Sequence, residues 1–188
     1  MGYLSSQVIN NMGFASVGQN VLISDKASFY NSSKITIGSN VRIDDFCVIS
    51  AGIGGIFIGN YIHIAVYSSL IGAGKITIGD FSNISSRVSI YSSNDDYSGN
   101  SMTSPLLPKE FTGITNADVF FEKHVIIGGG SIILPGIVLE EGVVIGAHSL
   151  VKNDCRAFGM YAGNPVRFIK DRSRNLLDLE KKFLNQVN

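Results

Sequence analysis

The chain has 188 residues, which is long enough for one domain with a hydrophobic core. Its 15 basic and 15 acidic residues balance, so it lacks the overall positive charge that favours binding to nucleic acid or an anionic membrane. No apolar run approaches the roughly 20 residues of a membrane helix, and no export signal is visible. These features predict a cytoplasmic protein with neither a nucleic acid nor a membrane as partner.

A short helix is predicted first, over residues 5–12 (SSQVINNM). From position 17 the chain repeats with a period of six residues. Each repeat begins with a large aliphatic residue and usually has a small or β-branched residue in its fifth position. The residues that begin the clearest repeats are Val17, Ile23, Ile37, Ile43, Ile49, Ile58, Ile64, Leu70, Ile78, Ile84, Ile90, Ile127, Ile133, Leu139, Ile145 and Val151.

This period fits neither an α-helix nor an ordinary strand. Six residues turn an α-helix by about 600°, so the aliphatic residues would drift off one face, and a half-buried strand alternates with a period of two. A coil with three short sides satisfies the pattern, and coils stacked at roughly 4.8 Å form three parallel sheets around a core. We therefore predict an all-β fold, a parallel β-helix over about residues 17–155. Cys47 and Cys155, each fifth in its repeat, are expected to be buried.

The repeat is interrupted at residues 91–118, which are rich in serine, asparagine and proline. A long internal insertion is usually either functional or disordered, and the aromatic and apolar residues of this one favour an ordered loop. Two adjacent carboxylates, Asp95 and Asp96, stand at its start. They are either part of a functional site or simply turn-forming residues, since the run Asn-Asp-Asp suits a bend.

The chain ends in a predicted amphipathic helix, at about residues 171–187. Its apolar stripe consists of Leu176, Leu179, Phe183 and Val187. With the repeats before it, this helix is expected to belong to a single domain over residues 1–188.

Two functions compatible with a β-helix are disfavoured by the residues. A zinc enzyme of the γ-carbonic-anhydrase type needs three converging histidines, whereas His63, His124 and His148 lie far apart along the chain, so no metal is expected. We expect His63 and His124 to face outward or to line a contact between subunits. A non-catalytic solenoid, for example an ice-binding or scaffolding protein, would leave the long insertion and its acidic pair unexplained.

The repeat pattern [LIV]-[GAED]-x-x-[STAV]-x resembles that of the left-handed parallel β-helix. The segments IIGGGSIILPGIVLEEGVVIGAHSLVKND and AGNPVRFIK look like the end of the hexapeptide-repeat acyltransferases. This resemblance implies a homotrimer in which acyl-CoA lies along the coils, in a groove between two subunits. The implied CoA contacts are Gly129 and Ala147, where small residues allow close approach, and Arg167 and Lys170, which would meet phosphates.

Members of that family that acetylate hydroxyls have a histidine base where this chain has Asp95. The pKa of an aspartate is about 3.9 and that of a histidine about 6.5, so aspartate is a poor base for a sugar hydroxyl. An amine with a pKa of about 7.7–8.0 is partly neutral at neutral pH and needs only orientation and a proton acceptor. The substitution therefore favours N-acylation, with O-acetylation of a sugar hydroxyl as the alternative.

Four further segments, VGQNVLISDKASFYN, IGSNVRIDDFC, ISSRVSIYSSNDDYSGN and EKHVIIGGGSII, resemble the bacterial nucleotide-sugar N-acyltransferases of anthrose biosynthesis. This resemblance implies acylation of the 4-amino group of a dTDP-linked 4-amino-4,6-dideoxy sugar by an acyl-CoA, in surface-polysaccharide assembly. It implies that Asp95 is the base and that Ser85 is a polar catalytic partner, while Asn83 and Asp96 are candidate substrate contacts.

Overall fold

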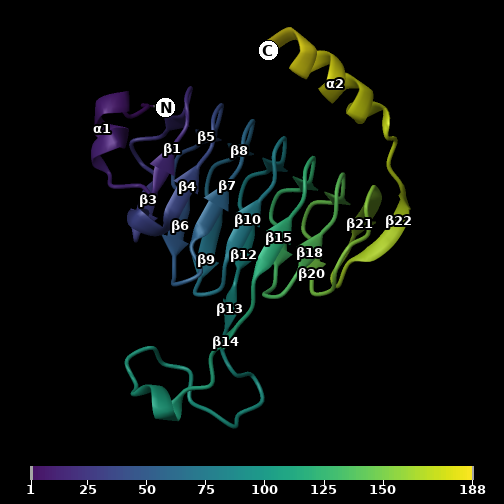
Figure 1. The fold of residues 1–188 in the computed structure, drawn as a ribbon. Coiled ribbons are helices and arrows are strands. Elements are labelled where there is room, and N and C mark those ends of the chain that lie inside the picture. The colour runs from purple at the N-terminus through teal and green to yellow at the C-terminus, as the bar shows by residue number, and fades with distance from the viewer. Residues whose placement is uncertain (1, 188) are drawn as a thin grey trace.

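The computed structural model describes residues 2–187 and shows short strands wound into a stack of coils (Figure 1). Parallel strands from successive coils pair along the stack and form three sheets. The first sheet contains β1 (Ser16–Val17), β4 (Ile35–Ile37), β7 (Ile56–Ile58), β10 (Ile76–Ile78), β15 (Val119–Phe121) and β18 (Val138–Leu139). The parallel β-helix predicted from the six-residue period is confirmed; its left-handed sense stays a prediction.

The other two sheets complete the coils. The second sheet contains β2 (Leu22–Ile23), β5 (Arg42–Ile43), β8 (His63–Ile64), β11 (Asn83–Ile84), β16 (Ile126–Ile127), β19 (Val144–Ile145), β21 (Gly159–Ala162) and β22 (Arg167–Asp171). The third sheet contains β3 (Ser28–Tyr30), β6 (Val48–Ala51), β9 (Ser69–Gly72), β12 (Ser89–Tyr91), β17 (Ile132–Ile133) and β20 (Leu150–Val151). The remaining elements are α1 (Ser6–Asn11), β13 (Ser93–Asn94), β14 (Thr115–Asn116), α2 (Asn175–Val187) and the short 3-10 helices η1 (Ser32–Lys34) and η2 (Lys109–Phe111).

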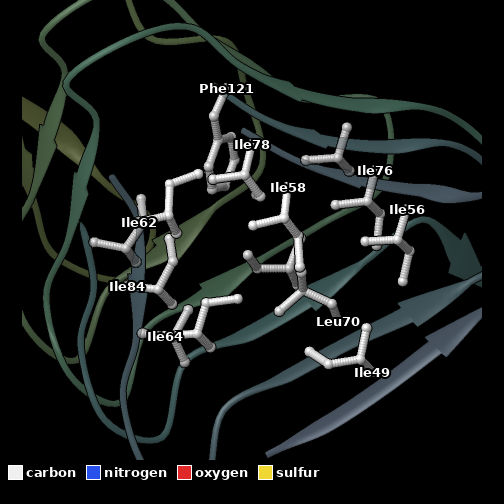
Figure 2. Close-up of a cluster of buried hydrophobic side chains, with 14 of the residues drawn as sticks. Ile49, Ile56, Ile58, Ile62, Ile64, Leu70, Ile76, Ile78, Ile84 and Phe121 are labelled. Carbon is white, nitrogen blue, oxygen red and sulfur yellow. The ribbon is translucent and has the colours of Figure 1, made fainter. Parts of the chain in front are cut away.

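The core is the column of residues that begin the repeats. Ile64 pairs with Ile84, which pairs in turn with Ile127, and all three are fully buried. Figure 2 shows Ile64 and Ile84 of the second sheet facing Ile58 and Ile78 of the first. Burial of this apolar surface is the main stabilising contribution, at about 25 cal/mol for each Å² removed from water.

Both cysteines lie in this core, as their repeat position predicts. Cys47 and Cys155 are free thiols with 0% and 1% of their surface exposed. Burial raises the pKa of each thiol to about 11, because the thiolate would lose its hydration. Both therefore stay protonated at neutral pH and act as small apolar side chains.

The predictions for the two ends of the chain have different outcomes. Helix α1 lies inside the predicted segment, and the Ser5 hydroxyl caps it by accepting from Val8 N. At the other end, the predicted boundaries were wrong. The second sheet continues past residue 155 through β21, and β22 then pairs antiparallel with β21, so Asp171 belongs to a strand and the helix begins only at Asn175. Among the described residues, no helix combines the length and apolar character that crossing a membrane requires.

Helix α2 runs back along the coils and packs on the corner between the first and second sheets (Figure 1). Phe183 meets the rings of Tyr61 and Phe81 edge-on, at 5.2 and 6.3 Å between centroids. The Glu180 carboxylate accepts from Lys123 Nζ at 2.8 Å and from His124 Nε2 at 2.9 Å. The rest of the predicted apolar stripe is less covered, since Leu179 and Val187 are more than half exposed.

The ion pairs of Glu180 predict a measurable contribution to the docking of α2. Burial alone would raise the pKa of Glu180, but hydrogen bonds from His124 and Lys123 lower it below its ordinary value. A Glu180→Gln variant should lose about 1–2 kcal/mol of stability and about 4 °C in Tm, measured by thermal unfolding. Because the folded-state pKa is lowered, the difference from the native chain should shrink as pH falls below about 4.3.

The matched control is Asp178→Asn on the same helix. Its carboxylate is 77% exposed and reaches Lys181 only at 4.0 Å, so neutralising it should leave Tm unchanged within about 1 °C. Equal losses in the two variants would mean that the charge of the helix, rather than its contact with His124 and Lys123, controls docking.

Candidate active site

The interruption of the repeat forms an arm that projects from the side of the coil, between β12 and β15 (Figure 1). Strands β13 and β14 pair antiparallel at its base. Ser93 fixes this base, because its hydroxyl accepts from Ala73 N at 2.6 Å and donates to Asn116 Oδ1 at 2.7 Å. Beyond the base, Tyr97 and Leu106 are 86% and 92% exposed. The predicted loop is therefore built on an anchored ribbon, while its apolar tip has little contact with its own chain.

A cavity of about 470 Å³ lies where the arm meets the third sheet. Its lining residues are Tyr91, Ser93, Asn94, Asp95, Tyr97, Ile114, Ile132, Leu134 and Leu150. Asp95 is the one carboxylate among them. The cavity is otherwise formed by apolar, aromatic and small polar groups, which is the usual composition of a small-molecule site.

Asp96 has different surroundings from its neighbour. Its Oδ1 accepts from Ser98 N at 2.8 Å, while its Oδ2 is buried and has no hydrogen-bond partner among residues 2–187. Hydrogen bonds from the side chain and backbone of Ser98 lower the pKa of Asp96. The geometry is that of a turn-forming aspartate at the start of the loop.

Ser85 lies at the corner between the second and third sheets, directly after β11. Gly129 packs against it from the next coil: a Cβ at Gly129 would lie 3.1 Å from Ser86 O and 3.9 Å from Ser85 Cβ. A Cβ at Gly128 would lie only 2.4 Å from Ala147 N, on the coil after that. The predicted residues Ser85, Gly129 and Ala147 thus follow one another along a single corner, whose small side chains leave the backbone accessible.

Asn83 and the two predicted cations lie on the second sheet beside this corner. Asn83 is on β11, in register with His63 on β8. Arg167 on β22 pairs with Ala162, whose Cβ packs against Gly146, so Arg167 lies at the C-terminal end of the corner. Lys170 pairs with Met160, farther along the strand, and both cations are exposed.

Within one chain, the predicted residues form two groups. Asp95 lines the cavity of the third sheet, whereas Ser85, Asn83 and Gly129 do not line it.

Comparison with known proteins identifies the family. No family model matches the chain. A dTDP-4-amino-4,6-dideoxy-D-glucose acyltransferase from Escherichia coli is 61% identical over 183 residues, which are 97% of this chain and 95% of that protein. The chain belongs to this acyltransferase family. A putative lipopolysaccharide biosynthesis O-acetyl transferase of Escherichia coli K12, WbbJ, is 29% identical to this chain over 150 residues. The match covers 79% of this chain and 74% of WbbJ.

The structure of the acyltransferase matches AntD, an N-acyltransferase from Bacillus cereus solved in complex with dTDP and 3-hydroxybutyryl-CoA. The two chains are 46% identical, the match covers 99% of this chain and 98% of that one, and the TM-score is 0.95. A serine variant of AntD has been solved with dTDP-4-amino-4,6-dideoxyglucose and Coenzyme A. Both the hexapeptide-repeat resemblance and the expected acyltransferase class are thereby confirmed.

The acyltransferase also contains a polar cluster that the sequence analysis did not identify. The Asp44 carboxylate, 4% exposed, contacts His63 Nε2 at 2.8 Å and accepts from Arg42 Nε at 2.7 Å. The only sequence signal was an acidic residue directly after Ile43, where most repeats have a small one. Among the described residues, no group of histidine, cysteine, aspartate or glutamate is arranged to hold a metal ion.

Proposed function

We propose that this acyltransferase transfers an acyl group from acyl-CoA to the amino group of a dTDP-4-amino-4,6-dideoxy sugar. The observation that carries the proposal is the 61% identity to a dTDP-4-amino-4,6-dideoxy-D-glucose acyltransferase across nearly the whole chain. An N-acylation also agrees with a carboxylate, rather than an imidazole, in the cavity beside the arm.

In the proposed reaction, the neutral sugar amine attacks the thioester carbonyl. A C–N bond forms, the C–S bond breaks, and CoA leaves as the thiolate, which takes up a proton. Asp95 orients the incoming amine and accepts the proton that the nitrogen loses. A carboxylate suffices for this role because an amine with a pKa near 8 is already partly neutral at pH 7.

Ser85 is proposed to contact the reacting centre from the corner of a second chain. The AntD structures support the choice of these two residue types, because an aspartate and a serine of that protein were substituted in turn. In AntD the substituted aspartate follows the serine by ten residues, and Asp95 follows Ser85 by the same interval.

The donor is proposed to lie along the corner of small residues, past Gly129 and Ala147, with its phosphates near Arg167 and Lys170. This placement puts the thioester beside Ser85 and leaves the cavity of Asp95 for the sugar. It requires two chains at each site, and we propose the homotrimer as the assembly that supplies them. Asn83 and Asp96 remain candidate contacts for the sugar.

The test is an acyl-transfer assay with acetyl-CoA or 3-hydroxybutyryl-CoA as donor and dTDP-4-amino-4,6-dideoxyglucose as acceptor. Release of free thiol should depend on the acceptor, and the product should resist hydroxylamine, because an amide resists it and an ester does not. The matched acceptor has a hydroxyl in place of the amine. Thiol release with the hydroxyl acceptor alone would establish O-acylation instead.

A further inference from the structure

The fourth residue of many repeats has a positive φ, a strained conformation for a bulky side chain. On the first sheet these residues form the corner toward the second sheet and include Tyr61, Phe81 and His124. On the second sheet they form the corner toward the third sheet and include Phe46, Tyr67 and Arg87, with φ of 60°, 61° and 60°. A left-handed conformation costs about 1–2 kcal/mol for each such residue, so a large side chain there calls for a compensating contact.

Helix α2 provides that contact at the first corner. The rings of Tyr61, Phe81 and His124 stack on one another at 5.0 and 5.1 Å between centroids, and Phe183 of the helix packs edge-on against the first two of them. Arg174, directly before the helix, lies 4.3 Å from the ring of Phe158 on the same corner. The aromatic side chains of this corner are thus explained by packing within the chain.

The second corner has an equivalent stack without a cover among residues 2–187. The rings of Phe46 and Tyr67 are parallel within 14° at 4.9 Å, yet they are 46% and 52% exposed. Arg87 continues the stack, with its guanidinium carbon 5.4 Å from the Tyr67 ring centre. Lys26 lies over Phe46 at the other end, but it is paired with Asp45 at 3.3 Å. No carboxylate among residues 2–187 pairs with Arg87.

Arg87 also stands at a boundary along this corner. It follows Ser85 by two residues. The backbone N–H of Arg87 donates to Val66 O at 3.0 Å, and the backbone N–H of Gly130 donates to Ser86 O at 2.9 Å. On its N-terminal side are Tyr67 and Phe46, and on its C-terminal side is the run of small residues. A Cβ at Gly130 would lie 2.6 Å from His148 Nδ1, so the His148 ring occupies the next position of the column.

We infer that Arg87 binds the diphosphate of the nucleotide-sugar acceptor. The inference rests on the proposed function and adds to it the residue that recognises the nucleotide part of the substrate. A guanidinium offers a planar fork of N–H donors that fits phosphate oxygens, and the ring of Tyr67 fixes its orientation in advance.

The position of Arg87 fits the order of groups in such an acceptor. The donor and the acceptor must meet at Ser85, and the donor is assigned to the small-residue side of the corner. The acceptor then extends to the other side, with its sugar at Ser85, its diphosphate at Arg87, and its base along the exposed edges of Tyr67 and Phe46. The steps from Arg87 to Tyr67 and from Tyr67 to Phe46 together span about 10 Å. The base of the nucleotide can pack edge-to-face against the rings of Tyr67 and Phe46.

The experiment measures binding of dTDP, thymidine and CoA to the purified protein by calorimetry. An Arg87→Ala variant should bind dTDP about 10- to 100-fold more weakly, because charge-assisted hydrogen bonds to phosphate are lost. Its affinities for thymidine, which has no phosphate, and for CoA should stay within about twofold of the native values. Arg87→Lys should recover part of the dTDP affinity, since it restores charge but not the fork.

The matched control is Arg174→Ala, which removes an arginine stacked in the same way on the corner that α2 covers. It should leave dTDP binding unchanged. Unaltered dTDP binding by Arg87→Ala would overturn the inference while leaving the proposed function intact. So would a loss of CoA affinity instead, or a change in molecular mass that marks Arg87 as a contact between chains. A native protein that does not bind dTDP at all would refute both the inference and the proposed function.

Discussion

An Asp95→Asn variant should fold normally and lose about 10²- to 10⁴-fold in kcat, the range that a positioned proton acceptor contributes. The amide has the shape of the carboxylate, so the cavity beside the arm keeps its form. It carries no charge to hold an ammonium group and cannot accept the proton that leaves the attacking nitrogen. The measurement is the steady-state release of thiol from acyl-CoA with the dTDP-amino sugar as acceptor, with molecular mass and Tm measured in parallel.

Asp96→Asn is the matched control, one residue away. The Asp96 side chain accepts from Ser98 N within its own loop, and an amide oxygen can still accept that hydrogen bond. We expect a change in kcat of less than about fivefold, because this substitution removes no proton acceptor from the proposed reaction, and the loss of a contact between Asp96 and the sugar would raise KM instead. Raising the pH should recover part of the rate of Asp95→Asn, since an amine with a pKa of about 8 then loses its proton to solvent. If the Asp95→Asn variant keeps the turnover of the native protein, Asp95 has no part in the reaction.

The coil could be predicted from the sequence because its cause is local and repeated. Each repeat places one aliphatic side chain inward and one small side chain near a corner, so a single period defines the core from Val17 to Val151. The end of the chain has no such regularity. All five residues of β22 are exposed, so no burial pattern distinguishes this strand, and only its pairing with β21 defines it.

The site was less predictable, for a physical reason. Small residues at Ser85 and Gly129 follow from corner packing alone, so their placement on one corner does not establish a role. Asp95 and the corner residues lie on separate parts of one chain, so their combination in one site depends on assembly, which spacing along a sequence does not encode. Arg87 was missed because the fourth position of a repeat points outward, and its residue type varies from repeat to repeat.

The core predicts the second large effect. A Phe121→Ala variant should lose about 3–5 kcal/mol of stability, because its ring is fully buried and the coils cannot collapse into the space it leaves. Phe121 begins the repeat that follows the arm, and it pairs with Ile78 before the interruption and with Leu139 after it. Figure 2 shows its ring against Ile78. In a stack where each coil contacts only its neighbours, a cavity there weakens the coupling of the two halves.

Phe120→Ala separates this effect from the mere loss of an aromatic ring. Phe120 precedes Phe121 in the same strand, but its side chain faces outward and is 42% exposed, so its removal should cost less than about 1 kcal/mol. Thermal unfolding should therefore show a loss of about 10 °C in Tm for Phe121→Ala and of only a few degrees for Phe120→Ala. Hydrogen exchange should locate the weakening at the coils on both sides of β15. Similar losses for the two variants would mean that the strand is stabilised by its outer face, and that the inward column does not control the cohesion of the coil.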